Sequence, residues 1–144
     1  MHHLPYRQYR QHRPRQDRGD RGSATTQLVI VVPALLMLAL LVVQFALAWH
    51  ARHIAQYAAE RALAAARVQH GSAADGRGRG VRALAELGGR VLSSPSVTVR
   101  RTPTRASVRV EGSVMPVVPG LHLTASGTAS GAVERLTTPA GDAL

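Results

Sequence analysis

The stretch LVIVVPALLMLALLVVQFALAW, from Leu28 to Trp49, decides the fold of this 144-residue chain. It contains no charged residue, and Gln44 is its single strongly polar side chain. As a helix rising about 1.5 Å per residue, it reaches roughly 33 Å and can span the roughly 30 Å hydrocarbon layer. A buried helix of a soluble protein would need apolar partners on every side, and the chain has no second apolar run. The stretch therefore predicts one membrane-spanning helix.

The charges on the two sides of this helix predict its orientation. Six arginines and two aspartates precede it, whereas the 20 residues after Trp49 carry three arginines and one glutamate. This bias predicts a cytoplasmic amino terminus in the cell membrane and an extracytoplasmic carboxy-terminal domain, with Trp49 at the outer interface. A cleaved secretory signal is the alternative, because Ala46-Leu47-Ala48 fits a small-x-small site that would release a domain starting at Trp49. The apolar run is, however, longer than the roughly 7–15 residues of such signals.

Arginine supplies all 18 basic residues, and the formal net charge is +10. A field of this sign attracts nucleic acid or anionic lipid. The amino-terminal arginines, from Arg7 to Arg21, adjoin the anchor, so membrane topology and anionic cytoplasmic lipid explain them. We therefore expect membrane lipid as a partner and do not expect nucleic acid.

The helix is expected to continue past the membrane to about Gln69, because His50 to Gln69 has no proline or glycine and is rich in alanine. Arg52, Gln56 and Glu60 share one stripe of it. Small or apolar residues form another surface, which permits close packing of helices or a sheet. This surface comprises Ile54, Ala55, Ala58, Ala59, Ala62, Leu63, Ala65 and Ala66.

Four glycines interrupt the helical pattern between Gly71 and Gly80 (GSAADGRGRG). No strand precedes this segment, so it is a weak candidate for a phosphate-binding loop. From Val81 to Leu92 the apolar residues recur at helical spacing, which predicts a short second helix weakened by Gly88-Gly89 and ended by Ser93-Ser94-Pro95.

After Pro95 the apolar period changes to two, which predicts three to four short strands, mostly antiparallel. The alternating residues are Val97 and Val99, Val108 and Val110, and Leu121, Leu123 and Ala125; the turns fall at Pro103, Pro116, Pro119 and Gly120. Arg100, Arg105 and Arg109 are expected on the solvent face of the sheet.

The predicted fold class is α+β. A long amino-terminal transmembrane helix continues into an alanine-rich helix, followed by the short second helix and a small antiparallel sheet. The expected division is a basic cytoplasmic leader at 1–22, the transmembrane helix at 23–49 and a small extracytoplasmic domain at 50–144.

Sites for chemistry are scarce in the sequence. The absence of cysteine excludes disulfides and thiolate chemistry. His50 and His53 could share a metal ion with His70 or His122, but no carboxylate stands at ligand spacing, so interfacial histidines are preferred and no metal or cofactor is expected. Acidic residues stand singly and no serine has a nucleophile-elbow context, so no enzymatic activity is expected.

Residues Arg21 to Leu28 (RGSATTQL), which run into Pro33 and the leucine-rich helix, resemble the start of the TadE-like pilus-assembly (pseudopilin) family. The segment Ala129–Leu136 (ASGAVERL) is similar to the carboxy-terminal pattern of that family. The resemblance implies that a prepilin-type peptidase is a partner and would cut between Gly22 and Ser23, which removes the leader. Gln27 stands where the family usually has glutamate, and its amide carries no charge to neutralise the new amino group. Both the cut and the uncut forms therefore stay open.

The resemblance also implies a function: a membrane-anchored minor pilin or pseudopilin that contributes to assembly of a tight-adherence (type IV-like) pilus. Its partners would be other pilus-assembly or pilin subunits, bound through helix packing, and its activity would be association and not catalysis. The alternative is an anchored or secreted basic module that binds an anionic cell-envelope polymer or extracellular DNA. Its binding residues would be Arg100, Arg101, Arg105 and Arg109.

Overall fold

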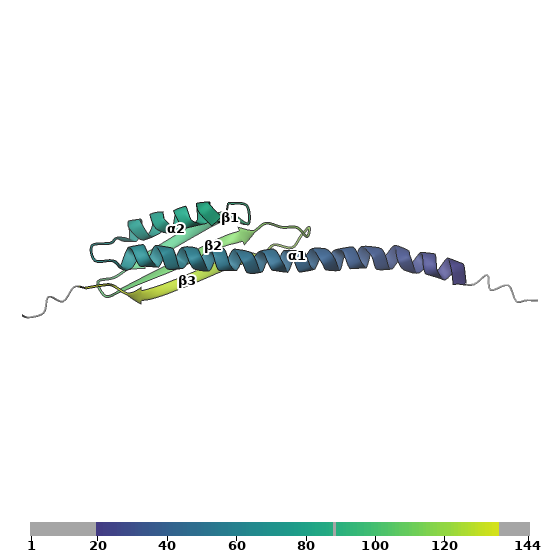
Figure 1. Cartoon of the computed structure of the whole chain (residues 1–144), viewed down its shortest axis with the longest axis horizontal. Helices are drawn as coiled ribbons and strands as arrows, with labels where there is room; N and C mark the ends of the chain where they lie inside the picture. The colour runs from purple at the N-terminus through teal and green to yellow at the C-terminus, as the bar shows by residue number, and fades with distance from the viewer. Residues whose placement is uncertain (1–19, 88, 136–144) are drawn as a thin grey trace, which may run out of the picture. The chain divides into compact units, whose positions relative to one another are not determined.

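The computed structural model describes residues 20–87 and 89–135 and confirms the α+β class (Figure 1). Most of the predicted leader and the last residue of the Ala129–Leu136 pattern lie outside these residues. The elements are α1 (Asp20–Arg67), α2 (Ala73–Leu87), β1 (Leu92–Arg101), β2 (Arg105–Val114) and β3 (Thr124–Ala132). The chain divides into two compact units, Met1–Leu36 and Met37–Leu144.

The described part of the first unit is the amino-terminal portion of α1. The large side chains from Leu28 to Leu36 that are described there are exposed, with Leu28 at 60% and Ile30 at 69%. Pro33 lies inside the helix. Because proline has no N–H, the carbonyl of Val29 lacks its usual helical donor at this point.

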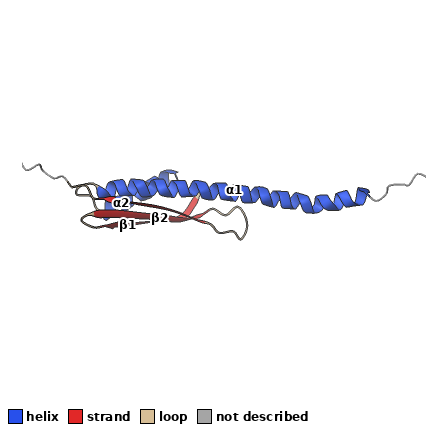
Figure 2. Ribbon diagram, turned by 90° about the horizontal axis from the view of Figure 1, so that it is seen from below, coloured by secondary structure: helices blue, strands red, loops and turns tan. Residues whose placement is uncertain are grey.

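The second unit is a three-stranded antiparallel sheet in the order β1-β2-β3, with α1 and α2 packed against it (Figure 2). Val108 is the centre of one inward row, since it pairs with Val99 on β1 and with Ala129 on β3. Burial alternates along β2, as a sheet with one solvated face requires. The opposite face carries Arg100, Arg105 and Arg109, whose predicted exposure is confirmed.

Helix α1 ends at Arg67, within two residues of the predicted end, but the prediction for the next segment was wrong. Residues 73–80 do not break the helical pattern; they form the first half of α2. A reciprocal cap starts this helix, because the Asp75 N–H donates to Ser72 Oγ (3.1 Å) and the Ser72 N–H donates to Asp75 Oδ2 (2.9 Å).

The glycines of α2 serve packing. A Cβ added at Gly76 would lie 2.8 Å from the Ala66 Cβ, and one at Gly80 would lie 3.0 Å from Val97 Cγ1. Glycine therefore lets α2 approach both α1 and β1 more closely than any other residue could. Gly76 and Gly80 are accordingly buried between these elements.

Two strand boundaries also differ from the prediction. β1 begins at Leu92, which the helical spacing predicts in the second helix, and contains Pro95. The register shifts between Ser93 and Ser96, and the missing N–H of a proline is tolerated at such an irregularity on an edge strand.

β3 begins only at Thr124, so Leu121 and Leu123 precede it, and it continues to Ala132 through alternating small residues. Ala125 and Gly127 are its buried inward positions. A Cβ at Gly127 would overlap the backbone of Ala55 and Gln56, so the backbones of α1 and β3 are in direct contact. No hydrophobic alternation marks β3, because this approach leaves no room for large side chains.

Candidate functional site

The apolar half of α1, which we define as Leu28–Val43, is almost completely exposed. Only 6% of the most apolar 18-residue window of this helix is buried, and α1 is the one described helix long and apolar enough to cross a membrane. A core helix of a soluble protein would be mostly buried, and so large an apolar surface is not stable in water. The apolar half therefore serves as a single-pass membrane anchor.

The alanine half of α1, which we define as Ala51–Ala66, has the opposite environment. Ala51, Ala55, Ala58, Ala59, Ala62 and Ala66 are all 0% exposed. They contact the sheet and α2 of their own chain and belong to its hydrophobic core. The small-residue surface predicted to permit close packing of helices or a sheet is thus occupied within the domain, apart from half-buried Ala65. The apolar half is therefore the part of α1 whose apolar side chains stay exposed.

Gln44 marks the boundary between the two halves and is the buried polar side chain of the described region, at 0% exposure. Its Oε1 accepts hydrogen bonds from the N–H groups of Val117 (2.6 Å) and Val118 (3.2 Å). Its Nε2 donates to the Met115 carbonyl at 3.3 Å. One amide thereby fixes the loop between β2 and β3 to α1, and no feature of the sequence identified this partner.

Gln56 joins the middle of α1 to β3. Its Oε1 accepts from the Thr128 N–H at 3.1 Å, and its Nε2 donates to the Thr128 carbonyl at 3.2 Å and to Glu60 Oε1 at 3.0 Å. The first two bonds imitate the pairing of a neighbouring strand. Since β3 is an edge strand, Gln56 covers part of the edge that another chain could otherwise pair with.

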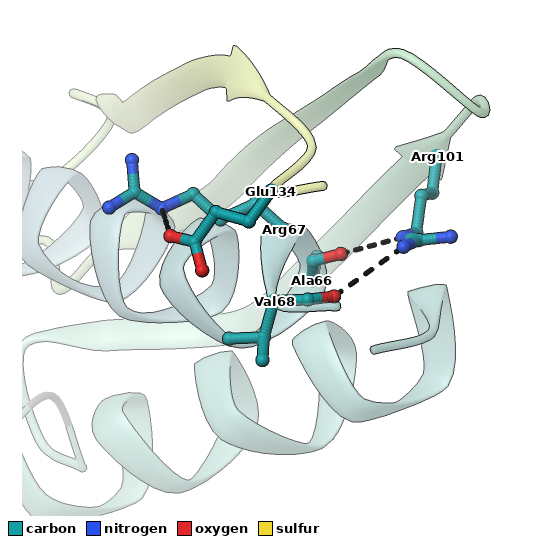
Figure 3. A network of polar contacts seen from close by, with 5 residues as sticks. All are labelled: Ala66, Arg67, Val68, Arg101 and Glu134. Carbon is teal, nitrogen blue, oxygen red and sulfur yellow. Dashed lines mark hydrogen bonds and ion pairs between the residues drawn. The ribbon is translucent and has the colours of Figure 1, made fainter. Parts of the chain in front are cut away.

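A third polar contact holds the end of α1 (Figure 3). The Arg101 guanidinium donates to the carbonyls of Ala66 (2.8 Å) and Val68 (3.5 Å) at the helix carboxyl terminus. Glu134 donates its backbone N–H to the Arg67 carbonyl at 2.9 Å, and its carboxylate lies 3.4 Å from Arg67 Nε. A guanidinium at this end is favourable because the last helical carbonyls lack intrahelical donors.

The predicted processing residues lie in the amino-terminal part of α1. Because α1 begins at Asp20, the bond between Gly22 and Ser23 lies in its first turn. The first N–H groups of a helix have no intrahelical acceptor, so this turn has fewer hydrogen bonds than the middle of the helix. Gln27 is exposed.

The polar residues considered for other chemistry are dispersed. The His53 ring packs edge-on against Trp49, with centroids 5.2 Å apart, and no group of three metal-ligating residues occurs in the part of the chain that is described. Arg109 Nε donates to Glu111 at 2.8 Å, and this hydrogen bond raises the pKa of Arg109 above its usual value. The Ser72 hydroxyl and N–H lower the pKa of Asp75.

Comparison with protein families shows that residues 22–64 fit the family model described as TadE-like protein. This is a TadE-like region. The match begins at the glycine of the predicted cut and includes the apolar half and most of the alanine half, which confirms the predicted resemblance. The TadE-like region ends before the sheet, so the similarity of residues 129–136 to the family pattern stays a prediction. No curated protein and no solved structure matches the chain.

Proposed function

We propose that this chain is a membrane-anchored TadE-like minor pilin or pseudopilin that contributes to assembly of a tight-adherence pilus. The proposal is supported by the location of the exposed apolar surface on α1. The TadE-like region contains the apolar half and most of the alanine half of α1; the domain of this chain covers the alanines of the second but leaves the apolar half uncovered. Helices with such surfaces associate in membranes through van der Waals packing.

In the proposed arrangement, the amino terminus is cytoplasmic and the α+β domain is extracytoplasmic. The arginines before the anchor support this orientation, because positively charged flanks are retained in the cytoplasm. The partners are other pilus-assembly or pilin subunits. A prepilin-type peptidase cuts between Gly22 and Ser23, which leaves an apolar helix starting at Ser23.

Amino-terminal sequencing of the membrane-extracted protein, expressed with a prepilin-type peptidase, tests the processing step. A start at Ser23 supports the proposal, and a start at Trp49 contradicts it, because the anchor would then be absent. A start at Met1 would show an uncut component. In that case the Gln27→Glu variant identifies the cause. Cleavage of this variant would mean that the missing carboxylate prevents processing, and no cleavage would mean that the peptidase does not use this site.

Photo-crosslinking in cells that make the pilus tests the association step. A crosslinking residue at Leu35, exposed by 59%, should capture other pilus subunits, whereas the same residue at Thr98, exposed on the outer face of the sheet, should capture far fewer. Equal capture at both positions would show that association does not depend on the apolar half. Capture at neither, with the chain extracted solely as a monomer, would contradict the proposal.

The alternative function as a basic binding module uses the outer face of the sheet, and the structure changes how it should be tested. Arg101 caps α1 and Arg109 is ion-paired with Glu111, while the side chains of Arg100 and Arg105 make no hydrogen bond or ion pair within residues 20–87 and 89–135. Binding of an anionic polymer should then fall in the Arg100→Gln/Arg105→Gln double variant and depend steeply on salt. Arg101 should be left in place because its loss would disturb the fold.

A further inference from the structure

The loop between β2 and β3, residues 115–123 (MPVVPGLHL), is apolar but is only partly packed into the core. It contains no Asp, Glu, Lys or Arg, and His122 is its single titratable side chain. Met115 is 51% exposed, and Pro116, Pro119 and Gly120 are also exposed, while Val118 is buried. A short loop of a water-soluble domain is usually polar, so this composition needs another explanation.

Gln44 fixes the position of this apolar loop, because its Oε1 accepts hydrogen bonds from the N–H groups of both Val117 and Val118. Gln44 precedes Trp49 by five residues in the uncharged segment. At about 1.5 Å per residue, the loop is attached roughly 7 Å from Trp49 toward the anchor. It therefore lies beside Met37–Phe45, whose described side chains are mostly exposed and apolar and belong to the same compact unit.

The backbone N–H groups of the apolar loop are partly satisfied within the chain. Two of its residues are prolines and have no N–H. Four further N–H groups have acceptors: Met115 donates to Val91, Val117 and Val118 donate to Gln44, and Leu121 donates to Val118. The N–H groups of Gly120, His122 and Leu123 have no acceptor within the described residues. Irregular backbone with such groups is not tolerated in the hydrocarbon, so the loop suits the headgroup boundary, where water remains.

A shallow hollow beside the loop combines apolar and cationic groups. It is lined on α1 by Phe45, Trp49 and Arg52, and at the start of β3 by Thr124 and Ser126. Phe45 and Trp49 are 61% and 68% exposed. Apolar rings at one end and a guanidinium with hydroxyls at the other match the boundary between acyl chains and phosphate headgroups.

From these contacts we infer that the apolar loop is a second membrane contact, seated at the headgroup boundary of the leaflet from which the α+β domain emerges, with Arg52 facing lipid phosphate. The occupant of this surface is phospholipid, because the surface is continuous with the membrane anchor. The inference rests on the proposed anchoring through the apolar half. It implies that the domain is held at the bilayer surface and does not hang from a flexible tether.

The test uses the full chain in vesicles of phosphatidylethanolamine and phosphatidylglycerol. Because the chain has no cysteine, single fluorophores can be placed by Met115→Cys, with Met37→Cys as the lipid control and Thr98→Cys, on the outer sheet face, as the water control. Nitroxide-bearing lipids should quench the label at position 115 several-fold more than the label at position 98. Aqueous iodide should show the reverse order.

The outcomes separate the inference from the anchoring on which it rests. If the label at position 37 is quenched by lipid but the label at 115 responds like that at 98, the inference is wrong and the anchor stands. If position 37 also fails to meet lipid, the anchor and the inference both fail. A label at 115 that becomes shielded from lipid quencher only as the protein-to-lipid ratio rises would assign the surface to a neighbouring subunit and overturn the lipid assignment.

Discussion

The two halves of α1 belong to one helix but fold by different physical means. The apolar half consists mostly of large side chains that are exposed, while the alanine half packs one face, made mainly of buried alanines, against its own domain. The first half depends on an apolar solvent, since its own domain gives it no partners. The second half depends on close approach, because alanine and the facing glycines bring backbones together. Side-chain size, more than hydrophobicity alone, distinguishes the apolar half from the alanine half.

Replacing Gly127 should produce the largest loss of stability, because this residue packs against the alanine half. In Gly127→Val the new side chain would overlap the α1 backbone at Ala55 and Gln56. We expect a loss of more than about 4 kcal/mol in the free energy of unfolding, enough to separate β3 from α1. Hydrogen exchange of the strand amides in detergent micelles measures this loss, and the apolar half should stay helical.

Gly78→Ala is the matched control for Gly127→Val. A Cβ at Gly78 meets nothing within 4 Å, and alanine is the better helix former, so α2 should gain about 0.5–1 kcal/mol. Equal destabilisation by both variants would contradict the close approach of α1 and β3.

Gln44→Leu tests the boundary between the halves. The variant is of similar size but leaves the Val117 and Val118 N–H groups without an acceptor, which should destabilise the loop by about 1–3 kcal/mol for each buried group. Limited proteolysis should then cut within residues 115–123. Phe45→Leu, at the adjacent exposed position, should leave the loop protected; cleavage in both variants would show that Gln44 does not hold it.

Ala62→Leu tests whether the alanine half accepts a large side chain of the kind that forms the apolar half. The Ala62 Cβ lies 3.1 Å from where a Cβ at Gly80 would stand, so leucine has no space. Overpacking of this kind typically destabilises by about 1–3 kcal/mol. Ala64→Leu, at an exposed position two residues along, should change the unfolding free energy by less than about 0.5 kcal/mol. Thermal unfolding of the two variants under one detergent condition gives the comparison.

The smallest expected effect concerns Asp75, which caps the helix that covers the alanine half. Its pKa is lowered from 3.8 by the Ser72 hydroxyl and N–H. The stabilisation is therefore present above the usual pKa and is lost as the pH falls through the lower folded pKa. Asp75→Asn should remove this pH dependence of unfolding below about pH 4, and Ser72→Ala should weaken it. An unchanged acid profile in Asp75→Asn would show that the cap does not contribute.

The sequence predicted the parts of the fold that have their own periodicity. The uncharged run gave the anchor, and the alternating valines gave the first two strands and the exposure of Arg100, Arg105 and Arg109. Residues 73–80 were misread because glycines normally interrupt helices, whereas here Gly76 and Gly80 face Ala62 and Ala66, also spaced by four. That matching spacing of small residues was the available signal for two closely packed helices.

The polar contacts that position α1 could not be predicted, because their partners are remote in sequence. Gln44 meets residues more than 70 positions away, and Arg101 looked like one more surface arginine. Neither residue type specifies a partner until the fold brings one near. The predicted processing residues, in contrast, are recognised from a local motif, which is why sequence reasoning could propose them without the fold.

Three contacts along α1, at Gln44, Gln56 and Arg67, attach the helix to the sheet and its loops at intervals of 12 and 11 residues, or roughly 17 Å each. A pull on the anchor along the helix axis would therefore load these contacts together, in shear, and would not peel them apart one after another. Single-molecule stretching should accordingly show one high-force rupture when the chain is held at its anchor and at Glu134. If the force instead pulls β1, an edge strand, away from β2, the domain should open at lower force.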